Sequence, residues 1–330
     1  MTMNHSTLPR PSLAPRASPD LRQLYARYGI LVALLIVCVS LSLATEFFMT
    51  WGNWADILRQ TSINGILAVG MTYVVLTGGI DLSVGAILAF SGIVSAWLVA
   101  SDGSYGVGTG VLAGLGVGLL LGSVNGLLVA RFSVPPFVAT LGMLSAARGF
   151  TYIFNDGMPV SDLPADFLAI GAARIGGVPL PILIFAAVVL LFWFVLRYTI
   201  YGRYIYAVGG NAKSAKTSGI GTRKVVFAVY AVSGLLAGLA GILLAARTTA
   251  ALPQAGISYE LDAIAAVVIG GTSLSGGTGS LGGTLLGALL IGVINNGLNL
   301  LGVSSYYQQV IKGVIIVAAV LLDTSRKGNR

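Results

Sequence analysis

The sequence predicts an all-α, polytopic membrane protein with about ten transmembrane or membrane-embedded helices. Of its 330 residues, 56% are hydrophobic and only 9% are charged, whereas soluble domains carry about 25% charged residues. The mean hydropathy is +0.89, and long apolar runs recur along most of the chain. Because so little charge cannot cover a surface that faces water, we expect a single transmembrane domain over residues 28–323.

Ten apolar segments account for the predicted helices, since a spanning helix needs about 20 apolar residues. The segment 261–271 is too short to span easily, and we expect residues 250–260 to complete its crossing in an extended form that lines the interior. The stretch 155–178 is polar and separates two of the helices. The ten segments are residues 28–48, 63–77, 83–100, 107–130, 137–154, 179–196, 225–246, 261–271, 281–301 and 306–322.

The distribution of charge predicts how these helices are oriented. The net charge is +8, and the basic residues lie mostly in short loops and tails, which is typical of the cytoplasmic side of a membrane protein. Ten crossings place both termini in the cytoplasm, on the same side as the basic segment 197–224. We therefore expect cytoplasmic tails at 1–27, which is also expected to be disordered, and at 324–330.

The same composition excludes several other classes of protein. Basic residues between apolar segments argue against nucleic acid as a partner, and the lipid bilayer is the expected surroundings. The single cysteine, Cys38, lies in an apolar run, so no disulfide framework is expected. The only histidine, His5, lies in a polar tail. We therefore expect no metal site.

Glycines recur at every fourth position in the segment 107–130 and just before it. Small residues at this spacing let membrane helices approach closely, where lipid offers no hydrophobic drive for association. We therefore expect close helix packing here rather than a role in solute binding. The glycines are Gly106, Gly110, Gly114, Gly118, Gly122 and Gly126, and Gly234 and Gly238 repeat the spacing.

Polar side chains inside the predicted helices are the candidates to line a translocation path. Each of them alone is more readily explained by hydrogen bonding between helices. A few weak hydrogen-bonding groups would nevertheless suit a solute that must be released. The candidates are Asn64, Thr72, Asn125, Thr140, Asn295, Asn296 and Asn299.

Three charged residues in or near the membrane need a partner or a special position. Arg148 and Lys312 are intramembrane charges, which usually face a cavity or form a pair. Glu260 and Asp262 are candidate partners for either of them. Asp81 precedes the helix at residue 83, and we favour an N-cap role over a transport role. The adjacent glycines at 78–79 break the helix where it should face protein or water.

The segment 197–224 is the most informative part of the chain, with six basic residues and no acid. Glycines at 209–210 end one helix, and Asn211 caps a short helix over 212–218 that stops at 219–221. By composition alone, an ordinary solvated loop is the favoured interpretation. The run 207–214 departs from a phosphate-binding loop at both glycine positions. We therefore expect no catalytic role, and any ATP hydrolysis would come from another chain.

Four segments resemble the permease subunits of bacterial sugar-importing ABC transporters, and the resemblance runs from about residue 50 to 322. They are GRYIYAVGGNAKSAKTSGI, TGGIDLSVGA, LDAIAAVVIGGTSLSGGTGS and NNGLNLLGVSSYYQQVIKG. The resemblance implies an inner-membrane permease in a core of two permeases, for which we expect a homodimer, with a pair formed with a paralogue as the alternative. It also implies a cytoplasmic ATPase that binds ATP and Mg, and a periplasmic binding protein that delivers a monosaccharide, ribose or a related small sugar.

The resemblance also assigns a role to the basic segment, whose short helix would couple the permease to the ATPase. This role maps onto Gly209, Asn211 and Gly219 and onto Ala212, Lys213, Ser214 and Ser218 between them. The chain departs from the family pattern at two points. Ala212-Lys213 stand where members often carry Glu after the Asn, and Gly221 stands where the ribose-transporting members carry Asn.

A stand-alone channel or secondary transporter for small polar solutes is the alternative. It predicts transport without ATP, and the basic segment would then only orient the protein. Ion coupling would require acids in the middle of the membrane, whereas the acids here lie at the ends of the predicted helices. The sequence therefore favours the ATP-driven importer.

Overall fold

The computed structural model describes residues 21–100 and 105–327, and these are mostly helical. The only strands among them, β1 (Arg174–Ile175) and β2 (Val178–Pro179), form a short antiparallel hairpin. The helices are α1 (Leu21–Ala44), α2 (Trp51–Leu76), α3 (Val84–Ala100), α4 (Val107–Ala130), α5 (Pro136–Phe154), α6 (Ala165–Ala172), α7 (Leu180–Tyr198), α8 (Ile200–Gly210), α9 (Ala212–Thr217), α10 (Thr222–Thr248), α11 (Tyr259–Ile269), α12 (Leu281–Leu300) and α13 (Ser305–Lys327).

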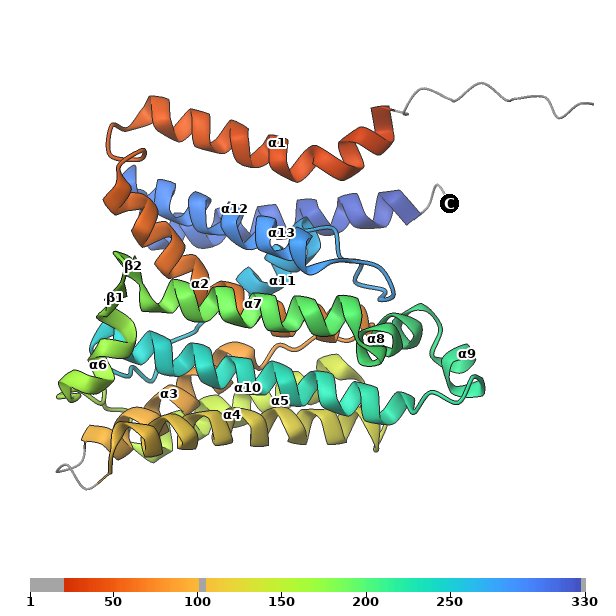
Figure 1. The fold of residues 1–330 in the computed structure, drawn as a ribbon, viewed down its shortest axis with the longest axis horizontal. Coiled ribbons are helices and arrows are strands. Elements are labelled where there is room, and N and C mark those ends of the chain that lie inside the picture. The colour runs from red at the N-terminus through yellow and green to blue at the C-terminus, as the bar shows by residue number, and fades with distance from the viewer. Residues whose placement is uncertain (1–20, 101–104, 328–330) are drawn as a thin grey trace, which may run out of the picture.

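Short elements lie at both ends of a layered bundle of long helices, and the short helix α11 lies inside it (Figure 1). The helix α6 and the β1–β2 hairpin lie at one end, and α8 and α9 lie at the other. The helix α1 begins, and α13 ends, at the end that carries α8 and α9. Five helices in the described residues are long and apolar enough to cross a membrane, namely α4, α5, α7, α10 and α12.

The helix α2 begins at Trp51, well before the predicted start at residue 63. Its first turns carry the polar residues Asn53, Asp56 and Arg59. The prediction missed these turns because it was based on apolar runs. Asp56 pairs with Arg59 one turn later, and Asn53 accepts a hydrogen bond from Asn296 of α12. The polar groups are therefore satisfied locally or by a neighbouring helix, so the helix extends through them.

Other predicted boundaries also need correction. The helix predicted to end at residue 196 continues as α7 to Tyr198, and the helices predicted to end at 209–210 and to cover 212–218 are α8 and α9. Residues 21–27 belong to α1 and 324–327 to α13, while 1–20 and 328–330 lie outside the described residues. The segment before α11 forms turns over 253–258 instead of an extended run. The helix α6 and the hairpin were not predicted.

The predicted close packing of glycines is confirmed between α4 and α10. A Cβ built on Gly118 would overlap the carbonyl oxygen of Gly234 and lie 2.9 Å from the Cα of Gly238. One turn further, a Cβ on Gly122 would lie 2.5 Å from the carbonyl oxygen of Tyr230. The two helices thus meet backbone to backbone, which only glycine allows.

Alanine at Gly118 should destabilise the bundle, because the added methyl group meets backbone atoms of α10 that cannot yield as a side chain can. Overpacking of this kind costs about 1–3 kcal/mol. Gly116 on the same helix is the matched control, since a Cβ there has no atom within 4 Å. Thermal unfolding in detergent should give a lower melting temperature for G118A and an unchanged one for G116A. Equal melting temperatures would contradict the packing described here.

Candidate functional site

The helices α8 and α9 are each started by a side chain that caps the helix. Thr199 accepts a hydrogen bond from the backbone N–H of Gly202 at 3.3 Å. The Oδ1 of Asn211 accepts one from the backbone N–H of Ser214 at 2.9 Å. The helix α9 ends before Gly219, whose φ is +83°. The predicted cap and the predicted glycine stop are both confirmed, with the last helical residue at Thr217.

The helix α9 is seated on the rest of the chain through one side chain. Ala215 is buried and belongs to the main hydrophobic core. Gly209 is half-buried, whereas the other predicted coupling residues and both lysines of α9 are exposed. The helix thus exposes small and basic side chains, while the buried side chain of Ala215 holds it against the core. The exposed residues are Ala212, Lys213, Ser214, Lys216, Thr217 and Ser218.

Two tyrosines of α8 tie the helix to neighbouring parts of the bundle. The hydroxyl of Tyr206 donates to the carbonyl oxygen of Gly279 at 2.9 Å, and that of Tyr201 donates to the carbonyl oxygen of Val225 at 3.4 Å. Burial raises the pKa of Tyr201 to about 12. Burial also raises the pKa of Tyr206, against a smaller opposing effect of Arg197. Both hydroxyls therefore stay protonated at neutral pH and remain donors.

The end of α8 meets two other segments at what we call the coupling junction, formed by Leu76, Gly209 and Gly277. A Cβ on Gly209 would overlap the carbonyl oxygen of Leu76 and lie 2.5 Å from the backbone nitrogen of Gly277. That nitrogen donates to the Leu76 carbonyl at 2.9 Å. The end of α8, the end of α2 and the turn between α11 and α12 are thus in backbone contact.

Asp81 lies fully buried at the break between α2 and α3. Its Oδ1 accepts hydrogen bonds from the backbone N–H of Ser83 at 3.0 Å and from its hydroxyl at 2.6 Å. Its Oδ2 accepts one from the hydroxyl of Ser233 on α10 at 2.8 Å. Asp81 therefore holds the turn at Ser83, directly before α3 begins at Val84, instead of capping the helix itself. The same carboxylate joins this turn to α10.

Two of the candidate path residues lie at this break and hold it to other helices. The side-chain amide of Asn125 on α4 donates to the hydroxyl of Ser83 at 2.8 Å. The hydroxyl of Thr140 on α5 lies 2.9 Å from the carbonyl oxygen of Pro136 and 3.4 Å from that of Ile80. Both side chains are fully buried. Their contacts are those of residues that hold helices together.

The partner of Lys312 is Asp262, with 2.9 Å between Nζ and Oδ2. The pair joins α13 to α11, and the side chain of Asp262 is almost fully buried. The amide of Asn64 on α2 also lies 3.5 Å from the same carboxylate oxygen. Asn295 on α12 is buried, and its Oδ1 has no hydrogen-bond partner among the described residues.

The guanidinium of Arg148 bonds to backbone carbonyls, and Glu260 is the acid that interacts with its charge at longer range. The Nη1 of Arg148 donates to the carbonyl oxygens of Pro253 at 2.6 Å and Ala255 at 2.8 Å. These carbonyls belong to the turn before α11, so Arg148 fixes that turn against α5. The sequence left open whether Glu260 or Asp262 pairs with Lys312. The structure shows that the partner of Lys312 is Asp262.

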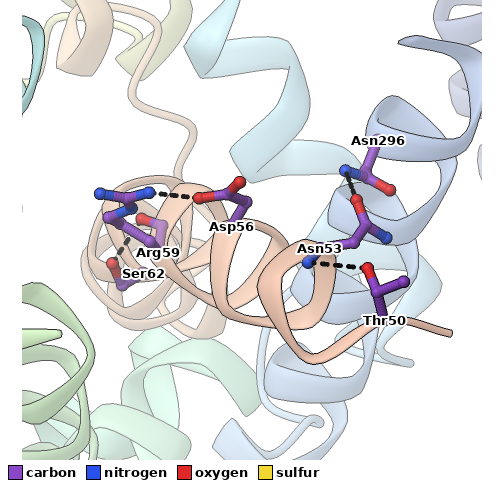
Figure 2. A network of polar contacts seen from close by, with 6 residues as sticks. All are labelled: Thr50, Asn53, Asp56, Arg59, Ser62 and Asn296. Carbon is purple, nitrogen blue, oxygen red and sulfur yellow. Dashed lines mark hydrogen bonds and ion pairs between the residues drawn. The ribbon is translucent and has the colours of Figure 1, made fainter. Parts of the chain in front are cut away.

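The remaining path candidates bridge α2, α12 and α13. Thr72 and Thr284 lie 2.8 Å apart through their hydroxyls. Asn299 accepts a hydrogen bond from Gln308 at 2.8 Å. Figure 2 shows a third bridge, where the amide of Asn296 donates to Asn53 at 2.8 Å, near the Asp56–Arg59 pair. Each of these candidates therefore takes part in helix packing.

Several members of these networks were not predicted from the sequence. Ser233 and Thr284 lie in glycine-rich apolar helices, and a hydroxyl there can bond to the carbonyl four residues back, as Thr72 does with Ala68. Such a side chain gives no sign in the sequence that it also bonds across helices. Asn53 was missed because it precedes the apolar part of α2.

Replacing Lys312 by methionine should destabilise the protein by about 3–5 kcal/mol, because it leaves the buried carboxylate of Asp262 without its cation. The double variant D262N/K312M removes both charges and should recover most of the loss. Melting temperatures of the two purified variants check this. If K312M alone matched the unchanged protein, the ion pair would have no structural role.

The comparisons with known proteins all identify transport permeases, and their descriptions name different solutes. The family model described as the permease component of branched-chain amino acid transport systems matches residues 53–320. The chain is 49% identical to the ribose import permease protein of Escherichia coli strain K12, over 90% of this chain and 93% of that one. It is 47% identical to the ribose import permease protein of Bacillus subtilis strain 168, over 91% and 93%.

A third relative has a different sugar in its name. The chain is 42% identical to the D-allose transport system permease protein of E. coli strain K12, over 90% of this chain and 91% of that one. No match was found among solved structures. The similarity covers nearly the whole length of each of these three relatives. The fold described above comes from the structure of this chain alone.

Proposed function

This chain belongs to the family of permease components of branched-chain amino acid transport systems, and within that family we propose that it carries a monosaccharide, ribose or a related small sugar, through the bacterial inner membrane. The sugar is proposed because the relatives named above are import permeases for ribose and D-allose. The chain itself is a permease subunit and carries out no catalysis. ATP and Mg bind to a partner ATPase, and a periplasmic binding protein delivers the sugar.

The observation that carries the mechanism is the coupling junction. The exposed helix α9 offers a docking surface, and Gly209 places α8 in backbone contact with the end of α2 and the α11–α12 turn. When the ATPase subunits close, they push on α9, and the junction passes the movement to α2 and α12. These two helices carry Asn64, Thr72, Asn295 and Asn296. The path opens to one side of the membrane or the other as the two helices shift.

The proposed orientation follows from the position of α8 and α9, which carry basic residues of the segment 197–224. The helix α1 begins and α13 ends at the same end of the bundle as α8 and α9 (Figure 1). Because basic residues favour the cytoplasmic side, that end and both termini are cytoplasmic in our proposal, with residues 28–323 forming a single domain that crosses the membrane ten times. The end with α6 and the β1–β2 hairpin then faces the binding protein.

The path is proposed to lie where buried acceptors lack partners. Among the path candidates, the Oδ1 atoms of Asn64, Asn125, Asn295 and Asn296 are buried and have no hydrogen-bond partner among the described residues. Asn64 and Asn295 also lie beside the carboxylate of Asp262. Sugar hydroxyls would donate to such oxygens and leave them again, since neutral hydrogen bonds contribute only about 1 kcal/mol each. In a homodimer, two such surfaces would face each other.

The experiment is uptake of labelled ribose into vesicles that contain the permease with its ATPase, with binding protein added outside. Uptake should require all three components and ATP. If the sugar crosses at the same rate without the ATPase, the chain is a channel or secondary transporter and the proposal is wrong. Titrating the binding protein with ribose, allose and arabinose then identifies the sugar.

A further inference from the structure

An open pocket of about 610 Å³ lies where α7 ends, α8 passes and α12 begins. It is lined by residues of all three helices and of the turn before α12. Arg197 and Arg203 line it, and neither forms an ion pair with an acid in the described residues. Its apolar wall is made of Trp193, Leu196 and Leu281. The pocket therefore combines two unpaired cations with an apolar surface.

The start of α12 adds donors to the same pocket. The hydroxyl of Ser280 accepts the hydrogen bond from the backbone N–H of Gly283, which leaves its own proton free to donate. Gly282 lines the pocket without a side chain to cover its backbone. The first N–H groups of a helix have no partner within the helix and favour an anion. Tyr206 is already engaged with Gly279, so the anion's donors are the arginines, Ser280 and the helix start.

The surroundings of the pocket indicate where the anion comes from. Trp193, Phe194 and Tyr198 are exposed on the last turns of α7, and Tyr198 contacts both of the other rings. Aromatic side chains at the end of an apolar spanning helix mark the level of the lipid headgroups. A free inorganic anion makes no favourable contact with this apolar wall. A phospholipid has both a phosphate for the arginines and acyl chains for the wall.

We propose that this pocket binds the headgroup of an anionic phospholipid. The guanidinium groups of Arg197 and Arg203 hold the phosphate, Ser280 and the start of α12 donate to it, and the chains lie along Trp193. Arginine suits this role because its planar fork can donate two hydrogen bonds to phosphate. The lipid thereby joins α7 and α8 to α12, beside the coupling junction. This inference does not depend on which solute the permease carries.

Native mass spectrometry of the purified permease in neutral detergent tests the proposal, with phosphatidylglycerol or phosphatidylcholine added. Phosphatidylglycerol should remain bound under conditions that strip phosphatidylcholine. R197Q and R203Q should each lower its affinity about fivefold. The matched control is R131Q, which removes the same charge from an exposed residue where α4 ends, at the same end of the bundle. It should leave the affinity unchanged.

Other outcomes would overturn the proposal. Equal retention of phosphatidylglycerol by R197Q, R203Q and R131Q would show that the pocket is not the lipid site. If inorganic phosphate displaces the lipid and binds with the same dependence on the arginines, the pocket takes a free anion and the lipid assignment is wrong. If the arginine variants keep the lipid but lose the ATPase, the arginines contact the partner protein instead. Unchanged melting temperatures exclude misfolding, as both side chains are exposed.

Discussion

Replacing Gly209 by alanine should abolish ATP-driven uptake. The new methyl group would overlap the carbonyl oxygen of Leu76 and press on the backbone of Gly277, so α8 must move away from α2 and from the α11–α12 turn. Overpacking costs about 1–3 kcal/mol even where side chains can yield, and here only backbone is present. We expect no uptake above background, while the ATPase still binds because α9 itself is unchanged.

The adjacent Gly210 provides the control for this variant. A Cβ on Gly210 has no atom within 4 Å, and the residue belongs to the same helix. G210A should therefore transport normally. The measurement is uptake and ATP hydrolysis by the same reconstituted complex, which for G209A should show hydrolysis without uptake. Normal uptake by G209A would mean that the junction does not transmit the movement.

Replacing Ser214 by tryptophan should release the ATPase from the permease. Ser214 is exposed on α9, and only its backbone N–H is used in the cap with Asn211, so the fold should tolerate the larger side chain. A bulky group in a docking surface opposes binding by steric clash. We expect the affinity for the ATPase to fall at least about tenfold, with an unchanged melting temperature.

The control for S214W is a tryptophan introduced at the opposite end of the molecule. R174W changes an exposed position in the β1–β2 hairpin, opposite α9 in Figure 1, and should leave ATPase binding intact. Affinity is measured by titrating labelled ATPase onto the purified permease. If both tryptophan variants bind equally well, α9 does not form the docking surface.

Features set by neighbouring residues, such as helix caps and stops, could be predicted from the sequence. Contacts between residues far apart in the sequence could not. The helix α9 could be predicted because its cap at Asn211 and its stop at Gly219 lie within a few residues of it. The partner of Lys312 could not, because Asp262 and Glu260 are almost equally placed in the sequence and only the packing of α13 on α11 selects one. Pairing of that kind depends on the whole bundle.

The coupling junction shows the same limit in another form. Gly209 was predicted as part of the coupling segment, from a resemblance to known permeases. Its physical role depends on Leu76 and Gly277, which lie far away in the sequence. The start of α2 was misplaced because Asn53 and Asp56 look like loop residues until their partners are known.

Site-specific photocrosslinking tests the central claim most directly, namely that α9 seats on the ATPase. A photoreactive phenylalanine analogue is placed at Thr217, an exposed residue of α9, or at Arg174 in the hairpin at the other end. In the assembled importer, Thr217 should give a covalent adduct with the ATPase subunit and Arg174 should give none. An intact complex in which Thr217 gives no ATPase adduct, or in which Arg174 does, would contradict the account.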